Sequence, residues 1–315
     1  MRIVLVGRMA ALGRERLVAL LNGRHEISVV LDPRAAPAET FEMADVIIGW
    51  PLSAEVIARA RRLKLLQAAG AGVDGVPFDA LGPGVVVANT FHHEVAMAEY
   101  VLMAMLYLAR RPDQYDARLR QGDWWGSCIW GEEPVLPMLH GSSVLLIGLG
   151  HIAREVEQRA TAFGMHVHGF GRADQGRWRD QLGEFDFVVP TCPLTSATVG
   201  LIGAAEFACM KPSAILINIT RGKVVDEQAL YEALRDHRIG GAAIDVWYQY
   251  PSHPEERRLP SRFPFHELPN VLMSPHNSGW TRRTVERRLV DIAANIECLA
   301  DGRPLRNVVW PRPSE

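Results

Sequence analysis

Residues 144–153 read Val-Leu-Leu-Ile-Gly-Leu-Gly-His-Ile-Ala, and this stretch decides the fold. Its four apolar residues predict a buried strand, and the helical spacing that follows over 151–163 predicts a helix. Gly148 and Gly150 permit a tight turn and let a pyrophosphate approach the backbone N–H groups at the start of that helix. Ala153 is a permitted small residue at the third position of the pattern. The stretch predicts a nucleotide-binding βα unit, with a glycine turn used only for packing as the alternative.

Short apolar runs alternate with helical patterns along the whole chain, which is typical of parallel sheets with crossover helices. The first series of runs covers residues 3–6, 27–31, 46–48, 63–67 and 85–89. The second series covers residues 144–148, 166–170, 185–189, 214–219, 242–246 and 271–273. We therefore predict an α/β fold of two doubly wound parallel-sheet (Rossmann-like) domains with an intervening cleft.

A long helix near 94–111 separates the two series of runs, and a last helix is expected over 281–300. We expect that last helix to return to the first domain, which makes the first domain discontinuous. The predicted domains are residues 1–93 with 285–315, and residues 94–284. The first would bind the substrate and the second the dinucleotide.

The composition of the 315 residues limits the classes of function. A hydrophobic content of 48% with 22% charged residues is typical of a globular protein with a substantial core. The net charge of −2 gives no case for nucleic acid or an anionic membrane as partner. The four cysteines are scattered, so we expect reduced thiols and no metal site. The first residues predict a strand and not a signal peptide, and the apolar stretch 95–109 is too short to span a bilayer, so we expect a cytoplasmic protein.

Two charged side chains stand just beyond predicted strands of the second domain. Arg221 follows the run 214–219, and His276 follows the run 271–273. Residues beyond the carboxyl ends of parallel strands face the ligand crevice. A fixed cation there can bind a carboxylate, and an imidazole can transfer a proton. With the nucleotide turn, these residues predict a redox enzyme that acts on a small anionic substrate.

The second strand of the nucleotide-binding domain indicates which cofactor is preferred. In enzymes that use NAD, this strand ends on an acid that holds the ribose 2′-hydroxyl. Here it ends Gly171-Arg172, with Arg177 and Arg179 following. A guanidinium can pair with a 2′-phosphate in a forked geometry, so we predict NADP with NAD as a possible cofactor. The alternative for Arg172 is a solvated loop charge.

Further segments match one family in order and spacing. They are residues 65–74 (Leu-Leu-Gln-Ala-Ala-Gly-Ala-Gly-Val-Asp), 95–99, 193–198, 210–214 through 243–246, and 268–276. With these segments the chain resembles the D-isomer-specific 2-hydroxyacid dehydrogenase family, which includes glyoxylate/hydroxypyruvate reductases and phosphoglycerate dehydrogenases. The resemblance extends over nearly the whole chain.

The resemblance implies roles for particular residues. Backbone amides of Ala71, Gly72 and Val73 would cradle the substrate carboxylate. Arg221 would bind the substrate carboxylate and keto oxygen, and His276 would be the acid in reduction and the base in oxidation. Asp245 would lie near the nicotinamide carboxamide, and Trp280 is a candidate for the substrate wall. The predicted cofactor-binding residues are Gly148, Gly150, His151, Ile152, Arg172, Pro193, Thr198, Ile219, Thr220, Asp245, His276 and Gly279.

One position departs from the family pattern. Family members place a glutamate five residues after the aspartate numbered 245 here, where it pairs with the histidine and keeps it protonated. This chain has Tyr250 in that place, and a phenol carries no charge at neutral pH. A polar insertion after Pro251 contains Glu255 and Glu256, either of which is an alternative partner for His276, and Gln249 is another possible neighbour.

Three functions follow from this sequence. The first is NAD(P)H-dependent reduction of a small 2-keto acid, of the glyoxylate or hydroxypyruvate type, to the D-2-hydroxy acid, with Arg221, His276 and Tyr250 as catalytic residues. The second is a dehydrogenase that needs less proton transfer, because the related formate dehydrogenase has glutamine at the position of Tyr250. The third is a catalytically weak or inactive nucleotide-binding sensor or interaction protein. The tryptophan-rich segment 121–140 predicts an extended arm that either contacts another subunit or packs on its own domain. The resemblance implies a homodimer.

Overall fold

The computed structural model describes residues 1–49, 52–130, 135–174, 176–253 and 255–311. The chain forms two compact units, one made of Met1–His93 with Trp280–Glu315 and the other of Glu94–Gly279. The second boundary lies earlier than the expected one at 284/285. The reason is that Thr281 caps the last helix, and Thr284 in the first turn of that helix donates a hydrogen bond of 3.1 Å to the carbonyl oxygen of His92 in the first unit.

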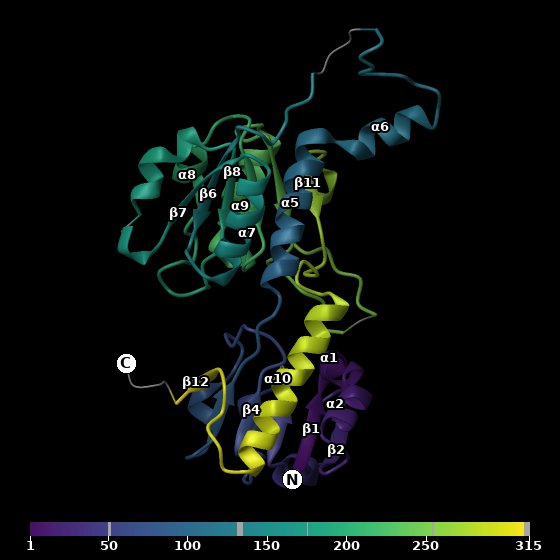
Figure 1. Cartoon of the computed structure of the whole chain (residues 1–315), viewed down its shortest axis with the longest axis vertical. Helices are drawn as coiled ribbons and strands as arrows, with labels where there is room; N and C mark the ends of the chain where they lie inside the picture. The colour runs from purple at the N-terminus through teal and green to yellow at the C-terminus, as the bar shows by residue number, and fades with distance from the viewer. Residues whose placement is uncertain (50–51, 131–134, 175, 254, 312–315) are drawn as a thin grey trace. The chain divides into compact units, whose positions relative to one another are not determined.

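The first unit is a six-stranded sheet with helices on both faces (Figure 1). The strand order is β12-β5-β4-β3-β1-β2, and every pairing is parallel except that of β12 with β5. Its elements are β1 (Arg2–Val6), α1 (Gly7–Leu12), α2 (Arg14–Leu20), β2 (Glu26–Val30), α3 (Ala38–Glu42), β3 (Val46–Ile48), α4 (Ala54–Arg59), β4 (Leu65–Gln67), the 3-10 helix η1 (Phe78–Ala80), β5 (Val86–Ala88), α10 (Arg282–Ala300) and β12 (Val308–Trp310).

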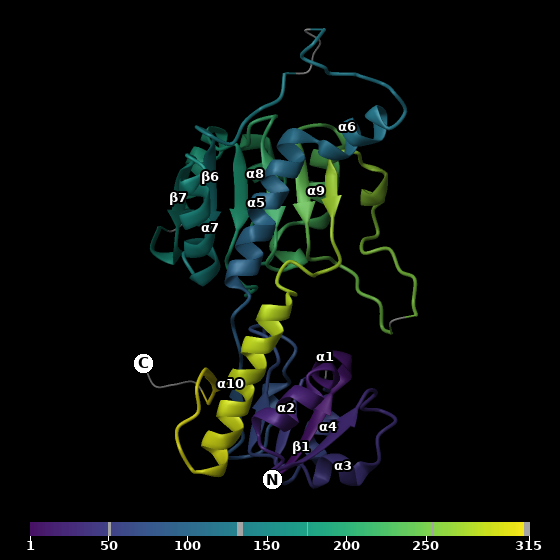
Figure 2. The same cartoon turned by 45° about the vertical axis from the view of Figure 1, so that its right-hand side comes forward.

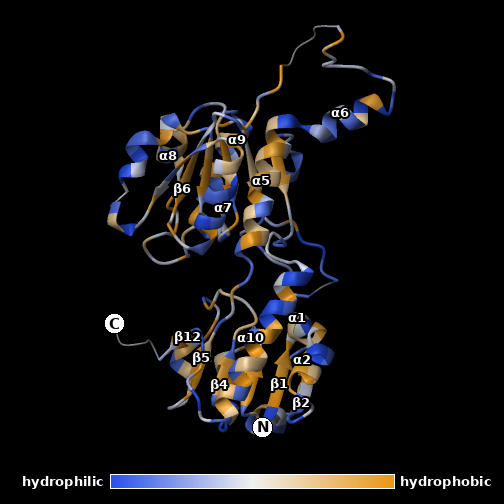
Figure 3. Cartoon of the chain, in the orientation of Figure 1, coloured by the Kyte–Doolittle hydropathy of each residue, from blue (hydrophilic) through white to orange (hydrophobic). Residues whose placement is uncertain are grey.

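Successive side chains of the central strands point to opposite faces of this sheet, so the first unit has a hydrophobic core on each face. In β1, Val4 and Val6 belong to the core that contains Phe41, whereas Ile3 and Leu5 belong to the core that contains Ile296 of α10. This is the period of two that a strand buried on both faces requires. Figure 3 shows the consequence, since the strands are coloured hydrophobic while α10 carries both kinds of residue.

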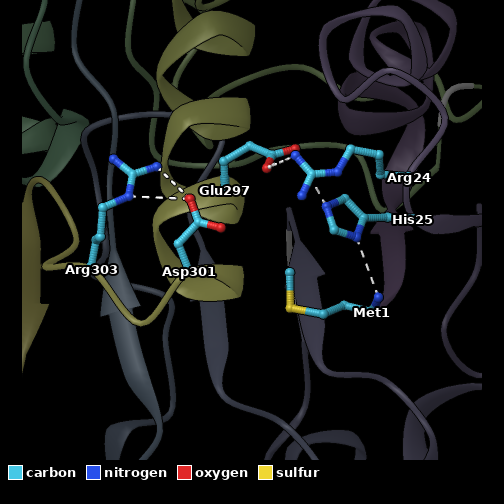
Figure 4. Close-up of polar contacts among 6 residues, drawn as sticks. All are labelled: Met1, Arg24, His25, Glu297, Asp301 and Arg303. Carbon is cyan, nitrogen blue, oxygen red and sulfur yellow. Dashed lines mark hydrogen bonds and ion pairs between the residues drawn. The ribbon is translucent and has the colours of Figure 1, made fainter.

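Helix α10 is fixed to the first sheet by buried and half-buried polar contacts. The Asn295 amide donates to Gln67 Oε1 (2.9 Å) on β4 and to the Arg306 carbonyl (3.0 Å), and its oxygen accepts from the Arg306 N–H. Near the end of the helix, Glu297 pairs with Arg24 (2.9 Å) and lies 3.5 Å from the His25 ring (Figure 4). The other ring nitrogen of His25 lies 3.3 Å from the α-amino nitrogen of Met1. The helix therefore belongs to the first unit although it follows the second unit in sequence.

The second unit is also a six-stranded sheet, with the order β11-β10-β9-β8-β6-β7 and parallel pairing throughout (Figure 2). Its elements are α5 (Glu94–Arg110), α6 (Pro112–Leu119), β6 (Ser143–Ile147), α7 (His151–Ala162), β7 (His166–Phe170), the 3-10 helices η2 (Arg172–Asp174) and η3 (Arg177–Glu184), β8 (Phe187–Pro190), α8 (Ala204–Cys209), β9 (Ile215–Asn218), η4 (Gly222–Val224), α9 (Glu227–Arg235), β10 (Gly241–Ile244), η5 (Phe265–Glu267) and β11 (Val271–Met273).

The two faces of the second sheet are covered by different helices. Val144 and Leu146 of β6 pack with buried residues of α5 and α7, whereas Leu145 and Ile147 pack with those of α8 and α9. The strand order reverses between β6 and β8, because β7 lies on one side of β6 and the later strands lie on the other. Such a reversal is where open α/β sheets bind ligands. The Gly148–Gly150 turn follows β6 at this point.

The predicted fold class, with two parallel α/β sheets and a discontinuous first domain, is confirmed. Strand β12 was not predicted, because it has only three residues, which are too few to show the alternation of a strand. The arm predicted over 121–140 includes residues 131–134, which lie outside the described residues. Trp124 and Trp130 are exposed, and Trp125 stacks on Tyr115 with ring centroids 5.3 Å apart. Among the described helices, none has both the length and the apolar character needed to cross a bilayer.

Candidate active site

The turn after β6 is held close to the neighbouring strands. Gly148 has a φ of +118°, and a Cβ at this position would lie 2.9 Å from the backbone nitrogen of Cys192. The Gly148 N–H donates to the Phe170 carbonyl at the end of β7 (2.8 Å), and its carbonyl accepts from the Thr191 hydroxyl (2.7 Å) after β8. Only glycine combines this backbone conformation with this close approach.

The start of α7 is open to a ligand. Gly150 is the N-cap residue, it is exposed, and a Cβ there would meet no atom within 4 Å. Gly150 has no side chain that could cap the helix, so the N–H groups of the first turn keep the partial positive charge that attracts a phosphate. His151, at the first position of the helix, is exposed, and Ile152 is half-buried. Gly148 and Gly150 therefore have the close backbone approach and the open helix start that a nucleotide-binding turn requires.

The three arginines that follow β7 in sequence differ in their contacts. Arg177 pairs with Asp174 at 3.0 Å, and Arg179 pairs with Glu206 at 2.6 Å. Asp174 also accepts a hydrogen bond of 2.6 Å from the Gly171 N–H. Arg172 is exposed and has no hydrogen-bond or carboxylate partner within the described part of the chain. It is therefore the arginine of this loop whose charge is not neutralised by a neighbouring carboxylate.

Two further loops complete the carboxyl edge of the second sheet. After β8, the Thr198 hydroxyl donates to the Pro193 carbonyl (2.7 Å) and closes a compact turn. After β9, Ile219 and Thr220 are buried, and Thr220 donates both its N–H and its hydroxyl to Asn218 Oδ1. Sequence reasoning did not assign a role to Asn218. The sequence feature that could have identified Asn218 is its amide side chain at the end of an otherwise apolar strand.

Arg221 is half-buried and directly precedes η4. Its carbonyl accepts from the Asn218 amide (3.1 Å), and its guanidinium donates to the Thr220 carbonyl (2.8 Å). The next residue, Gly222, lies so close to the carbonyl of Trp247 that a Cβ would overlap it. The turn that carries Arg221 is therefore fixed against the segment that follows β10.

His276 lies in the segment 274–278 after β11, which we call the strap. The fully buried Asp245 holds the strap, since one oxygen accepts from the Ser274 hydroxyl (2.6 Å) and the Asn277 N–H (2.9 Å). The other oxygen accepts from the Ser278 N–H (3.0 Å). His276 itself is exposed and has a φ of +57°, a left-handed conformation that costs a non-glycine residue about 1 kcal/mol. Gly279 follows the strap and is half-buried.

Tyr250, which occupies the position of the family's glutamate, contacts His276. The phenol oxygen lies 3.2 Å from His276 Nδ1, and it accepts a hydrogen bond of 3.0 Å from the Trp247 N–H. Of the two alternative glutamates, Glu256 accepts from the N–H and hydroxyl of Ser252, and Glu255 lies 3.4 Å from His253. The described groups near Nδ1 include the hydroxyl of Tyr250.

In the first unit, residues 70–73 form a loop after β4. The Ala71 carbonyl accepts from the Asn89 amide (2.9 Å), and the Val73 carbonyl accepts from the Val76 N–H (3.0 Å). Within the described residues, the N–H groups of Ala71, Gly72 and Val73 donate no hydrogen bond. Three successive backbone donors without an acceptor among the described residues are available to bind an anion.

Trp280 is 43% exposed and lines a small apolar pocket of the first unit with Met9, Ala69 and Leu289. The predicted site residues therefore fall into two groups. Ala71, Gly72, Val73 and Trp280 belong to the first unit, and the others are gathered in loops beyond the carboxyl ends of strands in the second. No cluster of three potential metal ligands occurs among the described residues.

The fold and the glycine turn at a helix N-terminus are those of a dinucleotide-binding α/β protein. Comparison with known proteins assigns the family. The profile of the D-isomer specific 2-hydroxyacid dehydrogenase NAD binding domain matches residues 102–278. The chain belongs to the D-isomer specific 2-hydroxyacid dehydrogenase family.

Three relatives illustrate the range of the family. Glyoxylate reductase of Thermococcus litoralis is 30% identical over 94% of this chain and 93% of its own length. D-3-phosphoglycerate dehydrogenase of Archaeoglobus fulgidus is 33% identical over 82% of this chain, which spans about half (49%) of that protein. The crystal structure of an NADPH-dependent glyoxylate/hydroxypyruvate reductase from Sinorhizobium meliloti, in complex with NADP and sulfate, has a TM-score of 0.80 and 26% identity, covering 98% of both chains.

The two glycines of the nucleotide turn should respond differently to alanine. Gly148→Ala forces a side chain into a left-handed backbone and against Cys192, so we expect a loss of about 2 kcal/mol in the free energy of unfolding of the cofactor-free protein. Gly150→Ala meets no atom, so stability should be unchanged while nucleotide binding weakens. Urea unfolding and nucleotide-dependent melting measure the two effects. Equal stability losses in both variants would contradict this assignment.

Proposed function

We propose that this protein reduces a small 2-keto acid to the D-2-hydroxy acid and that it prefers NADPH to NADH. The observation that carries the proposal is the placement of Arg221 and His276. They follow β9 and β11, the two strands that flank β10, at the edge of the sheet that also holds the nucleotide turn. The relatives named glyoxylate reductase support this type of substrate.

The residues of the second unit fit a nicotinamide dinucleotide. Gly148 leaves no room for a Cβ, the N-terminus of α7 has no capping side chain, and Arg172 stands without a partner among the described residues. The uncapped N–H groups would hold the pyrophosphate, and Arg172 would pair with a 2′-phosphate. His151, Ile152, Pro193, Thr198, Ile219, Thr220 and Gly279 would line the remainder. When bound, the cofactor supplies the hydride.

Each unit contains candidate groups for binding a carboxylate. In the first unit, the N–H groups of Ala71, Gly72 and Val73 would donate hydrogen bonds to a carboxylate, and in the second unit the guanidinium of Arg221 would bind the substrate carboxylate and keto oxygen. Hydride addition builds negative charge on that oxygen, which the guanidinium stabilises. Trp280 would form a wall against the side chain of the substrate.

His276 would give its proton from Nε2 to the developing alkoxide. We assign the Nδ1 proton to the hydrogen bond with Tyr250, because the phenol oxygen has two lone pairs and uses one for the Trp247 N–H. The imidazole then changes from charged to neutral without moving its Nδ1 proton. Tyr250 orients the ring in this scheme but adds no charge that would favour the protonated form.

The proposal is tested by initial rates of NADPH and NADH oxidation with glyoxylate, hydroxypyruvate and bulkier 2-keto acids from pH 5 to 9. Turnover that favours NADPH and is lost in Arg221→Gln and His276→Gln supports the reductase. Tight nucleotide binding without turnover of any acid would contradict it. That result would favour the second candidate, a nucleotide-binding sensor or interaction protein, which the neutral Tyr250 suggests.

The cofactor preference depends on Arg172. Replacing it by aspartate exchanges attraction of the 2′-phosphate for repulsion, so Arg172→Asp should lower the ratio of kcat/KM for NADPH over NADH by about 10- to 100-fold. The matched control is Arg177→Asp, because the Arg177 guanidinium is already paired with Asp174. An unchanged ratio in Arg172→Asp, or an equal change in both variants, would contradict the assignment.

Tyr250→Glu should move the pH dependence of reduction upward. Reduction needs the protonated imidazole, so the rate is full at low pH and falls as the ring loses its proton. A carboxylate beside Nδ1 favours the charged ring, so the fall should occur about one pH unit higher. Tyr250→Phe is the control without a hydroxyl and should not shift the profile upward. A profile of Tyr250→Glu that coincides with the wild type would contradict the contact.

We also propose that the protein is a homodimer joined through the second unit. Met103 and Leu106 of α5 and Phe163 after α7 are between 39% and 46% exposed, and they line one apolar surface pocket. Exposed apolar patches of this kind mark interaction sites.

In sedimentation equilibrium, the wild type should be a dimer and the double variant Met103→Glu/Leu106→Glu a monomer. Leu12→Glu replaces a 74% exposed leucine of α1 in the first unit and should leave the dimer intact. A monomeric wild type, or a dimeric double variant, would contradict the proposal.

A further inference from the structure

A chain of three side chains in the second unit leads from α5 to the strap that carries His276. The Tyr100 hydroxyl lies 2.7 Å from Ser274 Oγ, and Ser274 Oγ lies 2.6 Å from Asp245 Oδ1. An ionised carboxylate only accepts hydrogen bonds, so Ser274 must donate to Asp245. Ser274 Oγ then accepts from Tyr100. The chain therefore has one direction, Tyr100 to Ser274 to Asp245.

The environment keeps the donor at the head of this chain protonated. Burial is the main cause that raises the pKa of Tyr100 to about 12, and the Asp245 charge acts in the same direction. The phenol consequently remains a hydrogen-bond donor over the pH range in which an imidazole titrates. Its position on α5, which packs on the sheet, makes it a rigid support.

Ser274 is the first residue of the strap, and all its polar groups are engaged. Its N–H donates to the Ile244 carbonyl (3.0 Å), and its carbonyl accepts from Trp247 Nε1 (2.8 Å). Two residues later His276 adopts its left-handed conformation. Such a conformation persists only where the surrounding contacts determine it. The contacts at Ser274, Asn277 and Ser278 are those that fix the strap on both sides of His276.

We propose that Tyr100 is a positioning residue for the acid/base step: through Ser274 it orients the Asp245 carboxylate, which holds the strap and so places the His276 ring. The proposal rests on the proposed function for its catalytic consequence. Its structural content, the restraint of the strap by a side chain of α5, does not depend on turnover.

Tyr100→Phe removes one hydroxyl and keeps the ring. We expect kcat for 2-keto acid reduction to fall about 5- to 10-fold, the effect of one lost hydrogen bond at a reacting group, while the KM for NADPH changes less than about twofold. Ser274→Ala should reduce kcat at least as much, and Ser274→Thr, which keeps a hydroxyl, should restore it. Tyr231→Phe is the matched control, because Tyr231 lies on α9 of the same unit and packs against Phe263 and Phe265.

The double variant Tyr100→Phe/Ser274→Ala tests whether Tyr100 acts through Ser274 or whether the two residues affect kcat independently. Residues that act through one another are non-additive, so the double variant should be no slower than Ser274→Ala alone. Multiplied losses in the double variant would overturn the proposal, as would an unchanged kcat in Tyr100→Phe.

Amide hydrogen exchange supplies a measurement that needs no substrate. The N–H groups of Asn277 and Ser278 donate to Asp245, so their exchange should be faster in Tyr100→Phe and unchanged in Tyr231→Phe. If no 2-keto acid is reduced but exchange accelerates, the positioning role stands and the proposed function fails. If reduction occurs and exchange at these two amides is unaltered in Tyr100→Phe, the positioning role is overturned and the proposed function stands.

Discussion

A single buried carboxylate organises the edge of the second sheet. Asp245 follows β10 and is inaccessible to solvent, and a charge in such a place is stable only when its oxygens are satisfied. Three donors of the strap satisfy them. The same contacts that solvate the charge therefore hold the histidine segment in place. Loss of any one of them would weaken both the burial of Asp245 and the geometry of His276.

Because Tyr250 is neutral, it differs from a glutamate in what it provides to His276. With a glutamate, a histidine gains charge stabilisation and orientation from one partner. Here the phenol gives orientation, and its oxygen is itself fixed by the Trp247 N–H. The Trp247 side chain also donates to the Ser274 carbonyl, so one tryptophan contacts both the histidine's partner and the histidine's strap. The phenol that contacts the imidazole and the tryptophan that fixes this phenol are both uncharged, whereas the strap is held by the buried charge of Asp245.

The sequence predicted the second unit well because its signals are local. Buried parallel strands are continuous apolar runs, and Gly148 of the nucleotide turn is required by its φ and by close contact. The sequence did not predict β12 or the boundary at Gly279, because both depend on what α10 packs against. Nor could it show that Arg177 and Arg179 are paired with Asp174 and Glu206, since a partner distant in sequence leaves no local pattern. For the same reason, the apolar stretch 95–109 does not show that Tyr100 contacts Ser274.

The discontinuity of the first unit has a consequence for synthesis of the chain. Residues 94–279 leave the ribosome as one continuous piece, so every strand of the second sheet is available before α10 exists. The first sheet must wait, because β5 gains its outer neighbour β12, and Gln67 its partner Asn295, only when the last segment emerges. During that interval the edge of β5 lacks its neighbour, and the core beside Ile3 and Leu5 of β1 lacks the part that α10 supplies. Exposed edges and faces of this kind recruit chaperones or other chains, so the nascent first unit is the part of this protein most in need of protection.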